Sequence, residues 1–425
     1  MIRPIFLSGA LDFSSPYVLI IGASVIIVLS YLFNLLSEKT SIPSVLMLIL
    51  TGILMKLGFD QMHLTLPGLM PMLEILGIVG LIMIVLEAAL DLELSKEKLP
   101  LIGKSLLVAL LALIFSVLAV AFVLQQFIEM DFIKAMLYAT PLSIMSSAII
   151  IPSVNKCLPH TKEFMIYEST FSDILGIMLF YFLISFMDSG GKAAASGFGI
   201  SFVLTVVVAI VASYVLVFLF KDLKGHIRLF LLIAILLILY AAGKLLHLSP
   251  LLIILVFGLA LKNHKIFFKV FKNDLDPEND PIAKIEGEFH LITLETAFVV
   301  RTFFFVIFGM TIVLSSLVNM NVAIISVLVL LALYVVRFVF LKLFVKTGIL
   351  PELFIAPRGL ITILLFFAIP VVHQVEAFDS GILLYVILVS SLIMTFSLIS
   401  DGKRIKGMKV DGTLEVGEID TSGEH

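Results

Sequence analysis

The chain has 425 residues, of which 61% are hydrophobic and only 14% are charged, and its formal net charge is −3. Soluble globular domains are about 45 to 50% apolar and about 25% charged, so this composition lies outside that class and predicts a membrane protein with many spans. The small net charge and the lack of a dense basic patch argue against a nucleic-acid partner.

Thirteen stretches are long and apolar enough to cross a bilayer, if shorter pieces are allowed where proline or glycine interrupts them. They predict an all-α polytopic membrane protein, with a transmembrane domain over residues 1–400 and a disordered cytoplasmic tail over residues 401–425. Their approximate limits are 16–36, 42–58, 71–90, 102–126, 132–155, 164–187, 197–220, 228–246, 249–263, 289–316, 320–345, 352–372 and 381–400.

Lysine and arginine fall mainly on one side of these spans. If the C-terminus is cytoplasmic, 20 of the 28 basic residues lie on the inner side, five lie outside, and Arg301, Arg337 and Arg358 lie within spans. Basic residues are retained in cytoplasmic loops, so this distribution predicts a plasma (inner) membrane protein whose N-terminus is outside. The polar stretch 263–288 is expected to be a solvated loop.

Spans three and five carry the first polar features. Glu87 lies about one turn from the cytoplasmic end of span three, where it is either a ligand for an incoming cation or an interfacial acid. Span five is interrupted over Ala139–Ser147, a stretch that contains Thr140, Pro141 and three serines. Proline removes a backbone donor and nearby hydroxyls can satisfy the freed groups, so this span can unwind near mid-membrane and offer carbonyls to a cation. A plain proline kink is the alternative.

Span six holds two acids, Glu168 and Asp173. A charged side chain near mid-membrane costs about 2.5 to 3.5 kcal/mol, so two acids predict a site that offsets this cost with water, a cation or a basic partner. Five helical residues turn the chain by about 500°, so the two acids point about 140° apart and cannot share one site. We therefore expect Asp173 in an ion or proton pathway and Glu168 in a structural ion pair.

Three arginines within spans are the available basic partners. Arg337 lies in an apolar stretch without an acid in its own helix, so its partner must come from another span. Span twelve is interrupted at Pro357, Arg358 and Gly359. Arg358 could hydrogen-bond the carbonyls of span five or stabilise a half-helix end, whereas Arg301 could extend toward the cytoplasm.

Spans four to six and eleven to thirteen share one layout, in which an interrupted span lies between two longer helices. A six-span unit that is repeated after a single linking span is inserted in the opposite sense, which is the inverted-repeat plan of secondary carriers. This layout predicts two inverted six-helix repeats whose broken helices five and twelve cross at mid-membrane. The core helices would cover about 102–187 and 320–400, and the other helices would form a scaffold or dimer interface.

The sequence contains no His-Glu-x-x-His motif, glycine-rich phosphate loop or cysteine cluster, so we expect no cofactor and no enzymatic activity. An intramembrane enzyme would also need a Ser/Lys, Ser/His or paired-Asp arrangement with its partner motif. A sodium-coupled solute symporter on the same inverted-repeat plan stays open, and it would show substrate-dependent sodium uptake.

These features together resemble the monovalent cation/proton antiporter superfamily over the chain up to about Ser400. The Glu-Ser and Ser-Asp pairs at 168–169 and 172–173 are similar to the acid motif of its sodium/proton exchanger branch, which has Glu-Ser, two residues, then Asn-Asp. Three further stretches resemble the family's Phe-Glu-Gly-Gly-Leu, Phe-rich Gly-Met and Arg-Gly signatures, and these are Leu86–Leu90, Phe304–Met310 and Pro357–Gly359.

The resemblance implies that Asp173 exchanges a monovalent cation for a proton. It also implies that Ser169 and Ser172 are neighbouring ligands and that Thr140 offers its carbonyl at the break in span five. Monovalent cations, protons and the lipid bilayer would be the partners, and the protein would be a homodimer. The structural ion pair of the core would join Glu168 and Arg337.

The chain departs from the exchanger pattern at two places. Ser172 stands where that branch has Asn and electrogenic relatives have Asp, and span five has no Asp between Thr140 and Pro141. The Ser-Ser-Ala stretch 146–148 resembles the potassium-efflux branch instead. With one exchanging acid, the sequence predicts electroneutral 1:1 exchange of Na⁺, or of Li⁺ or K⁺, for H⁺. A potassium/proton efflux carrier is the alternative.

Overall fold

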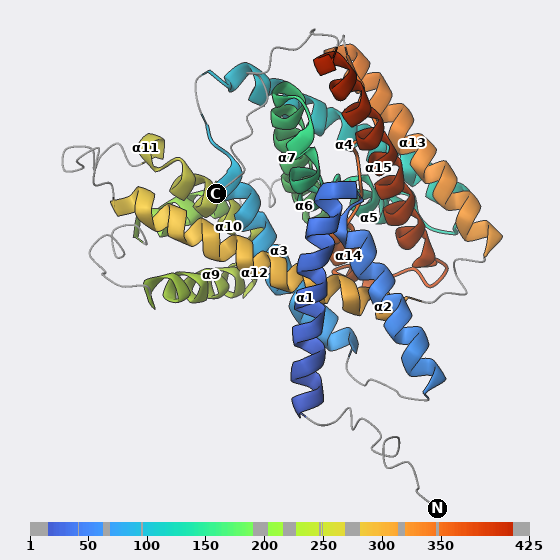
Figure 1. The fold of residues 1–425 in the computed structure, drawn as a ribbon, viewed down its shortest axis with the longest axis horizontal. Helices are drawn as coiled ribbons and strands as arrows, with labels where there is room; N and C mark the ends of the chain where they lie inside the picture. The colour runs from blue at the N-terminus through green and yellow to red at the C-terminus, as the bar shows by residue number, and fades with distance from the viewer. Residues whose placement is uncertain are drawn as a thin grey trace, which may run out of the picture.

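The computed structural model describes residues 16–40, 42–62, 69–94, 97–189, 203–215, 227–245, 248, 250–267, 281–312, 319–345 and 348–410. All regular elements within these residues are helical, as Figure 1 shows. The elements are α1 (Pro16–Thr40), α2 (Ser44–Gln61), α3 (Leu69–Asp91), α4 (Leu99–Phe127), α5 (Phe132–Ser143), α6 (Ser147–Ser153), η1 (Val154–Lys156), α7 (Pro159–Ser189), α9 (Ile227–Leu245), α10 (Pro250–Lys262), α11 (His264–Phe267), α12 (Pro281–Thr311), α13 (Met320–Phe344), α14 (Leu360–Phe367), η4 (Val371–His373) and α15 (Gly381–Val410).

Nine helical segments of the described chain are long and apolar enough to span a bilayer, and they correspond to predicted spans one to six, ten, eleven and thirteen. Predicted spans seven, eight and nine coincide with the shorter apolar helices Val203–Val215, Leu231–Leu245 and Pro250–Lys262. The number thirteen and the inverted relation of the two halves stay predictions. α15 continues as a helix beyond Ser400 to Val410, and residues 411–425 of the predicted tail lie outside the described residues.

α4 illustrates how these sequences form membrane helices. A spanning segment must satisfy its backbone groups internally, and an apolar helix does so. Small residues at helical spacing, such as Ser105, Ala112 and Ser116, are buried and let α5, α7 and α13 approach closely. On the opposite face, Leu110 and Phe122 are exposed, as a surface in contact with lipid requires.

The helices form two groups. In the first, α4 packs against α5, α7 and α13, while α13 packs against α15; in the second, α12 packs against α2, α3 and α9, while α10 packs against α3 and α9. Figure 1 shows α13 and α15 on one side of the molecule and α9, α10 and α12 on the other. The groups meet where α7 and α14 contact α3. The predicted core helices thus pack against one another, and the division into core and scaffold stays a prediction.

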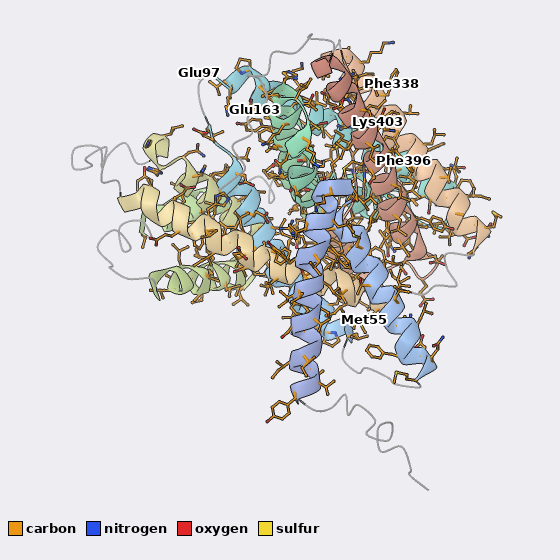
Figure 2. The ribbon with its side chains drawn as sticks, viewed as in Figure 1. Met55, Glu97, Glu163, Phe338, Phe396 and Lys403 are labelled. Carbon is orange, nitrogen blue, oxygen red and sulfur yellow. The ribbon has the colours of Figure 1, made fainter. Side chains whose placement is uncertain are left out.

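The outer surface of the first group is apolar. Phe338 on α13 and Phe396 on α15 are exposed, and Figure 2 shows them on the outside of the bundle. Glu97 and Glu163 lie together at one end of the molecule in the same view, and Glu163 pairs with Lys98 at 3.1 Å. Charged residues therefore gather at a helix end, where a membrane gives way to water.

Both interrupted spans are broken in the structure. Span five is split into α5 and α6 by the extended residues Ile144–Ser146, and span twelve is extended from Ile355 to Gly359 before α14 begins. The break in span five lies within the predicted stretch Ala139–Ser147, although α5 continues through Pro141 to Ser143. The two breaks touch, since the Ser146 backbone N–H donates to the Pro357 carbonyl at 2.9 Å.

Candidate functional site

Asp173 lies on α7 beside the break in span five and is almost fully buried. Its Oδ2 accepts a hydrogen bond from the backbone N–H of Ser147, the first residue of α6, at 3.2 Å. Its Oδ1 has no hydrogen-bond donor among the described residues. A buried carboxylate oxygen without a donor is costly unless a proton, a cation or water completes it.

A small cavity lies against Asp173. Its volume is about 20 Å³, which is room for one water-sized species. Thr170 is the other polar residue of the lining, and the remaining side chains are apolar, from α3, α7, α10 and α14. One water-sized species therefore fits beside this carboxylate.

The hydroxyls of Ser172 and Ser169 are both bonded to backbone groups and not to Asp173. The Ser172 hydroxyl accepts the backbone N–H of Met145 at 3.0 Å, so it satisfies a donor that the break in span five leaves free. The Ser169 hydroxyl donates to the carbonyl of Ile166 in its own helix at 3.2 Å. Both serines are buried within the same turn region as Asp173.

Thr140 lies within α5 and not at the break. Its hydroxyl donates to the Met136 carbonyl at 2.8 Å, and the carbonyls next to the break belong to Leu142 and Ser143. The expectation that Thr140 borders the break is therefore corrected, because Pro141 is accommodated inside the helix.

Glu168 and Arg337 form a buried ion pair that joins α7 to α13. Arg337 Nη1 lies 2.7 Å from Glu168 Oε1, and Nη2 lies 3.0 Å from Oε2, so the contact is bidentate. Arg337 also donates to the backbone carbonyls of Glu352, at 2.8 and 3.1 Å, and of Leu353, at 3.2 Å. The guanidinium thus has several acceptors, whereas the Glu168 carboxylate depends on this arginine.

Arg358 fastens the crossing of the two broken spans. Its Nε donates to the Leu142 carbonyl at 3.0 Å and Nη2 to the Ser143 carbonyl at 3.3 Å, which are acceptors that the end of α5 leaves unpaired. Its Nη1 donates to the carbonyl of Ala356. Gly359 permits the close approach, because a Cβ there would lie 2.7 Å from both Ser146 Oγ and Ile149 Cδ1.

Glu87 on α3 is paired with Arg301 on α12. Arg301 Nη2 lies 3.1 and 3.2 Å from the two carboxylate oxygens, and Nη1 donates to the Ala148 carbonyl of α6 at 3.1 Å. Arg301 therefore has an acidic partner on another helix, and its extension toward the cytoplasm stays a prediction. Ala148 is the neighbour of Ser147, so this pair lies one residue from the backbone group that holds Asp173.

A cavity of about 770 Å³, which we call the vestibule, opens beside the Glu87–Arg301 pair. It lies between α1, α2, α3, α6 and α12, and many of its lining residues are polar. Its charged lining residues are Glu87, Asp91, Lys156, Glu295 and Arg301. A water-filled approach of this kind would let hydrated cations come close to the site at the break.

Sequence reasoning missed two residues of this region. Ser147 supplies its backbone N–H to Asp173, and Glu352 anchors the Arg337 segment while its own Oε1 accepts the Thr161 hydroxyl at 2.7 Å. Glu352 is buried and is the first residue of predicted span twelve, so an acid at the start of an apolar run was the available signal. The identity of its partner, 191 residues away along the chain, could not be inferred from spacing.

Comparison with known proteins adds a family and a fold. Residues 24–400 match the family model described as sodium/hydrogen exchanger, transmembrane. No curated protein matches. The fold is similar to the structure of the sodium proton antiporter MjNhaP1 from Methanocaldococcus jannaschii at pH 8, with a TM-score of 0.67 and 18% identity over 93% of this chain and 98% of that one. An electron-microscopy map of the same antiporter matches with a TM-score of 0.65 and 18% identity, over 94% and 99% of the two chains.

These matches confirm the all-helical membrane fold and the transporter class that the spans and motifs predict. The family model covers most of the chain, including both broken spans and both acids of α7. The chain belongs to the sodium/hydrogen exchanger family, within the monovalent cation/proton antiporter superfamily.

Proposed function

We propose that this cation/proton exchanger uses the single carboxylate of Asp173 to bind either a monovalent cation or a proton, in electroneutral 1:1 exchange. The observation that carries the proposal is the buried Oδ1 of Asp173, which has no donor in the described residues, on a side chain that lines a cavity for one small species. Na⁺ is the first choice of cation, and Li⁺ or K⁺ would use the same atoms.

The exchange follows from the electrostatics of an isolated buried acid. A carboxylate in a low-dielectric site needs a positive partner, and a bound proton and a bound cation each remove the need for the other. The Ser147 N–H keeps Oδ2 in place, while Oδ1 is free to change its ligand. Because Glu168 is already paired with Arg337, it does not compete for the cation.

The structure supports fewer side-chain ligands than the sequence suggests. The hydroxyls of Thr140, Ser169 and Ser172 are engaged with backbone groups, so they would contribute only after rearrangement. Glu87 faces Arg301 and would act on the route to the site. A site with few ligands suits an ion that loses its water easily, and K⁺ is more weakly hydrated than Na⁺, so a potassium/proton carrier is the second candidate.

The first experiment replaces Asp173 with Asn in everted vesicles or proteoliposomes. Cation-dependent proton flux should fall to background, because an amide cannot exchange a proton for a cation, while the protein should remain folded. Glu163→Gln is the matched control, since it removes an acid from the same helix at a half-exposed position. Retained flux in Asp173→Asn would refute the site.

The second experiment tests stoichiometry. One cation exchanged for one proton moves no net charge, so the flux equilibrium in proteoliposomes should not change when a membrane potential is imposed with a potassium ionophore. A moving charge would contribute about 2.3 kcal/mol per 100 mV, which is easily detected. An equilibrium that follows the potential would exclude the 1:1 proposal. Parallel assays with Na⁺, Li⁺ and K⁺ identify the cation.

We further propose that the protein is a homodimer in the plasma (inner) membrane, with its C-terminus in the cytoplasm. The family resemblance supports the dimer, and the distribution of basic residues supports the orientation. Chemical cross-linking in membranes and mass measurement in detergent would test the dimer.

A further inference from the structure

The small cavity beside Asp173 is lined by a second polar residue, Thr170, which lies about one helical turn earlier on α7. The residues that α7 contributes to the lining are spaced as one face of a helix, and they are Thr170, Asp173, Ile174, Ile177 and Met178. Ser169 and Ser172 do not belong to this lining, and the residues from α3, α10 and α14 are apolar. Among the residues that the structure describes around the cavity, Thr170 is therefore the one with a hydroxyl.

The hydroxyl of Thr170 is already used as a donor. Thr170 is fully buried, and its Oγ1 donates to the carbonyl of Ile166 in the preceding turn at 2.8 Å. A threonine hydroxyl has one proton and two lone pairs, so this bond occupies the proton and leaves the oxygen as an acceptor. An oxygen in this state can coordinate a cation without first giving up its hydrogen bond.

A cation beside Asp173 needs more than one oxygen. Oxygens of the protein, or water that the ion keeps, must replace the part of the hydration shell that the ion loses on entry. Asp173 offers Oδ1, because its Oδ2 already accepts the backbone N–H of Ser147. The apolar walls of the cavity add no ligand, and Ser169, which makes a similar bond to Ile166, lies outside the lining.

We propose that the Thr170 hydroxyl is a ligand of the exchanged cation, together with Oδ1 of Asp173. The proposal rests on the proposed function, in which Asp173 is the exchanging carboxylate. Thr170 and Asp173 are three residues apart on α7, so both side chains are carried by one helical turn and stay together when the helix groups move.

This common helix predicts which kinetic constant depends on Thr170. A contact that is kept throughout the exchange stabilises the bound cation before and during the movement equally. Its loss therefore raises the KM for the cation and leaves the maximal rate unchanged. A ligand from α3 or α10 would instead be gained or lost during the movement, and its removal would change the maximal rate.

Three variants separate the oxygen of Thr170 from its methyl group. Thr170→Val keeps the shape and removes the oxygen, Thr170→Ala removes the oxygen and the methyl group, and Thr170→Ser keeps the oxygen alone. Initial rates of proton flux in proteoliposomes are measured against the concentration of Na⁺, or of Li⁺ or K⁺ if wild type exchanges that ion instead. An alkaline pH is used, because protons then compete least for Asp173.

The KM should rise about ten- to hundredfold in Thr170→Val and in Thr170→Ala, because a polar contact with a charged group is lost, and the maximal rate should be retained. Thr170→Ser should keep a KM close to that of wild type. Binding is measured separately, as the cation concentration that raises the midpoint of thermal unfolding in detergent. This concentration should increase by the same factor as the KM in the two variants that lack the oxygen.

Thr293→Val on α12 is the matched control. Thr293 is also fully buried and donates to the carbonyl of Phe289 in the preceding turn at 2.8 Å, but it lies outside the cavity lining. Its loss removes the same kind of bond, so KM and cation binding should match wild type.

A wild-type KM and wild-type binding in Thr170→Val would overturn the proposal and leave Thr170 as a structural residue. A loss in Thr170→Ser as large as that in Thr170→Val would also overturn it, because the oxygen would then not be what matters. Flux that persists in Asp173→Asn refutes the proposed function instead, so the two failures can be told apart.

Discussion

The two acids of α7, Glu168 and Asp173, have similar carboxylates but different neighbours. Glu168 faces a guanidinium with both oxygens, whereas Asp173 has one backbone donor and one oxygen without a partner. Their five-residue separation turns them toward different neighbours, α13 for Glu168 and the small cavity for Asp173. A buried acid that is fixed by arginine stabilises the fold, and one that lacks a cation can exchange its ligand.

Removing Arg337 from its ion pair with Glu168 should destabilise the protein more than removing Glu168. Arg337→Gln should lower the free energy of unfolding by about 3 to 5 kcal/mol, because it leaves the Glu168 carboxylate buried without a cation. Glu168→Gln should cost less, about 1 to 3 kcal/mol, because Arg337 retains a neutral acceptor and the carbonyls of Glu352 and Leu353. Thermal unfolding in detergent measures both.

The double variant Glu168→Gln with Arg337→Gln should cost less than the two single changes together, because neither residue then leaves an isolated charge. It is a cleaner test than exchanging the two charges, which would place a carboxylate at 337 against backbone carbonyls. Additive losses, or a larger loss for Glu168→Gln than for Arg337→Gln, would show that the pair is not the organising contact.

At the scale of elements, each broken span satisfies backbone groups that the other leaves without partners. Arg358 donates to the carbonyls that the end of α5 leaves unpaired, and the free N–H groups at the break donate to Pro357, Ser172 and Asp173. Almost every partner comes from another span, so neither break would be stable alone inside a bilayer. The same contacts bring the carboxylate of α7 to the start of α6.

A single methyl group added at Gly359, where the two broken spans cross, should strongly slow exchange. Gly359→Ala places a Cβ 2.7 Å from Ser146 Oγ and 3.1 Å from Ser146 Cβ, so the two segments must separate and the exchange rate should fall at least about tenfold, for about 1.4 kcal/mol of misplacement. Adding Ser146→Gly removes both of these atoms and should restore part of the rate.

Gly402→Ala on α15 is the control, because a Cβ there meets nothing within 4 Å. It should leave exchange unchanged, since alanine is a better helix former than glycine. If Gly359→Ala exchanges cations at the wild-type rate, or if Ser146→Gly gives no recovery, close contact at the crossing is not what positions the site.

Charge and hydrophobic periodicity, which the sequence displays directly, predict helices and membrane spans better than they predict which distant residues come into contact. The acids, apolar runs and prolines predicted the membrane class, the two interrupted spans and the different surroundings of Glu168 and Asp173. The interrupted stretch Ala139–Ser147 could be predicted, but the residues Ile144–Ser146 that form the break within it could not, because Pro141 is tolerated within α5 and the break depends on Arg358 and Pro357, more than 200 residues away. For the same reason Arg301 and Glu352 could not be assigned to their partners.

At the scale of the whole molecule, the two helix groups define where the site can be reached. α7 and α14 of the first group contact α3 of the second, and the small cavity beside Asp173 lies at this boundary. The vestibule opens between α6 of the first group and α1, α2, α3 and α12 of the second. A relative movement of the groups would therefore change access to Asp173, and the side to which the vestibule opens depends on the orientation of the chain.

The predicted orientation can be tested with introduced cysteines, because the native one should stay silent. Cys157 is the only cysteine, and burial, with the nearby carboxylates of Asp401 and Glu352 adding to it, raises the pKa of its thiol to about 12. The thiolate is the form that reacts with maleimides, so a membrane-impermeant maleimide should label the native protein only after denaturation.

Lys403→Cys on α15 and Asp60→Cys on α2 then report on the two sides, since both positions are exposed. With the C-terminus in the cytoplasm, Lys403→Cys should be labelled in everted vesicles and Asp60→Cys in right-side-out vesicles. The reverse pattern would invert the orientation and place the vestibule outside the cell. Labelling of both cysteines from the same side would require a different number of spans between them, because an odd number of crossings after α2 must place these positions on opposite faces.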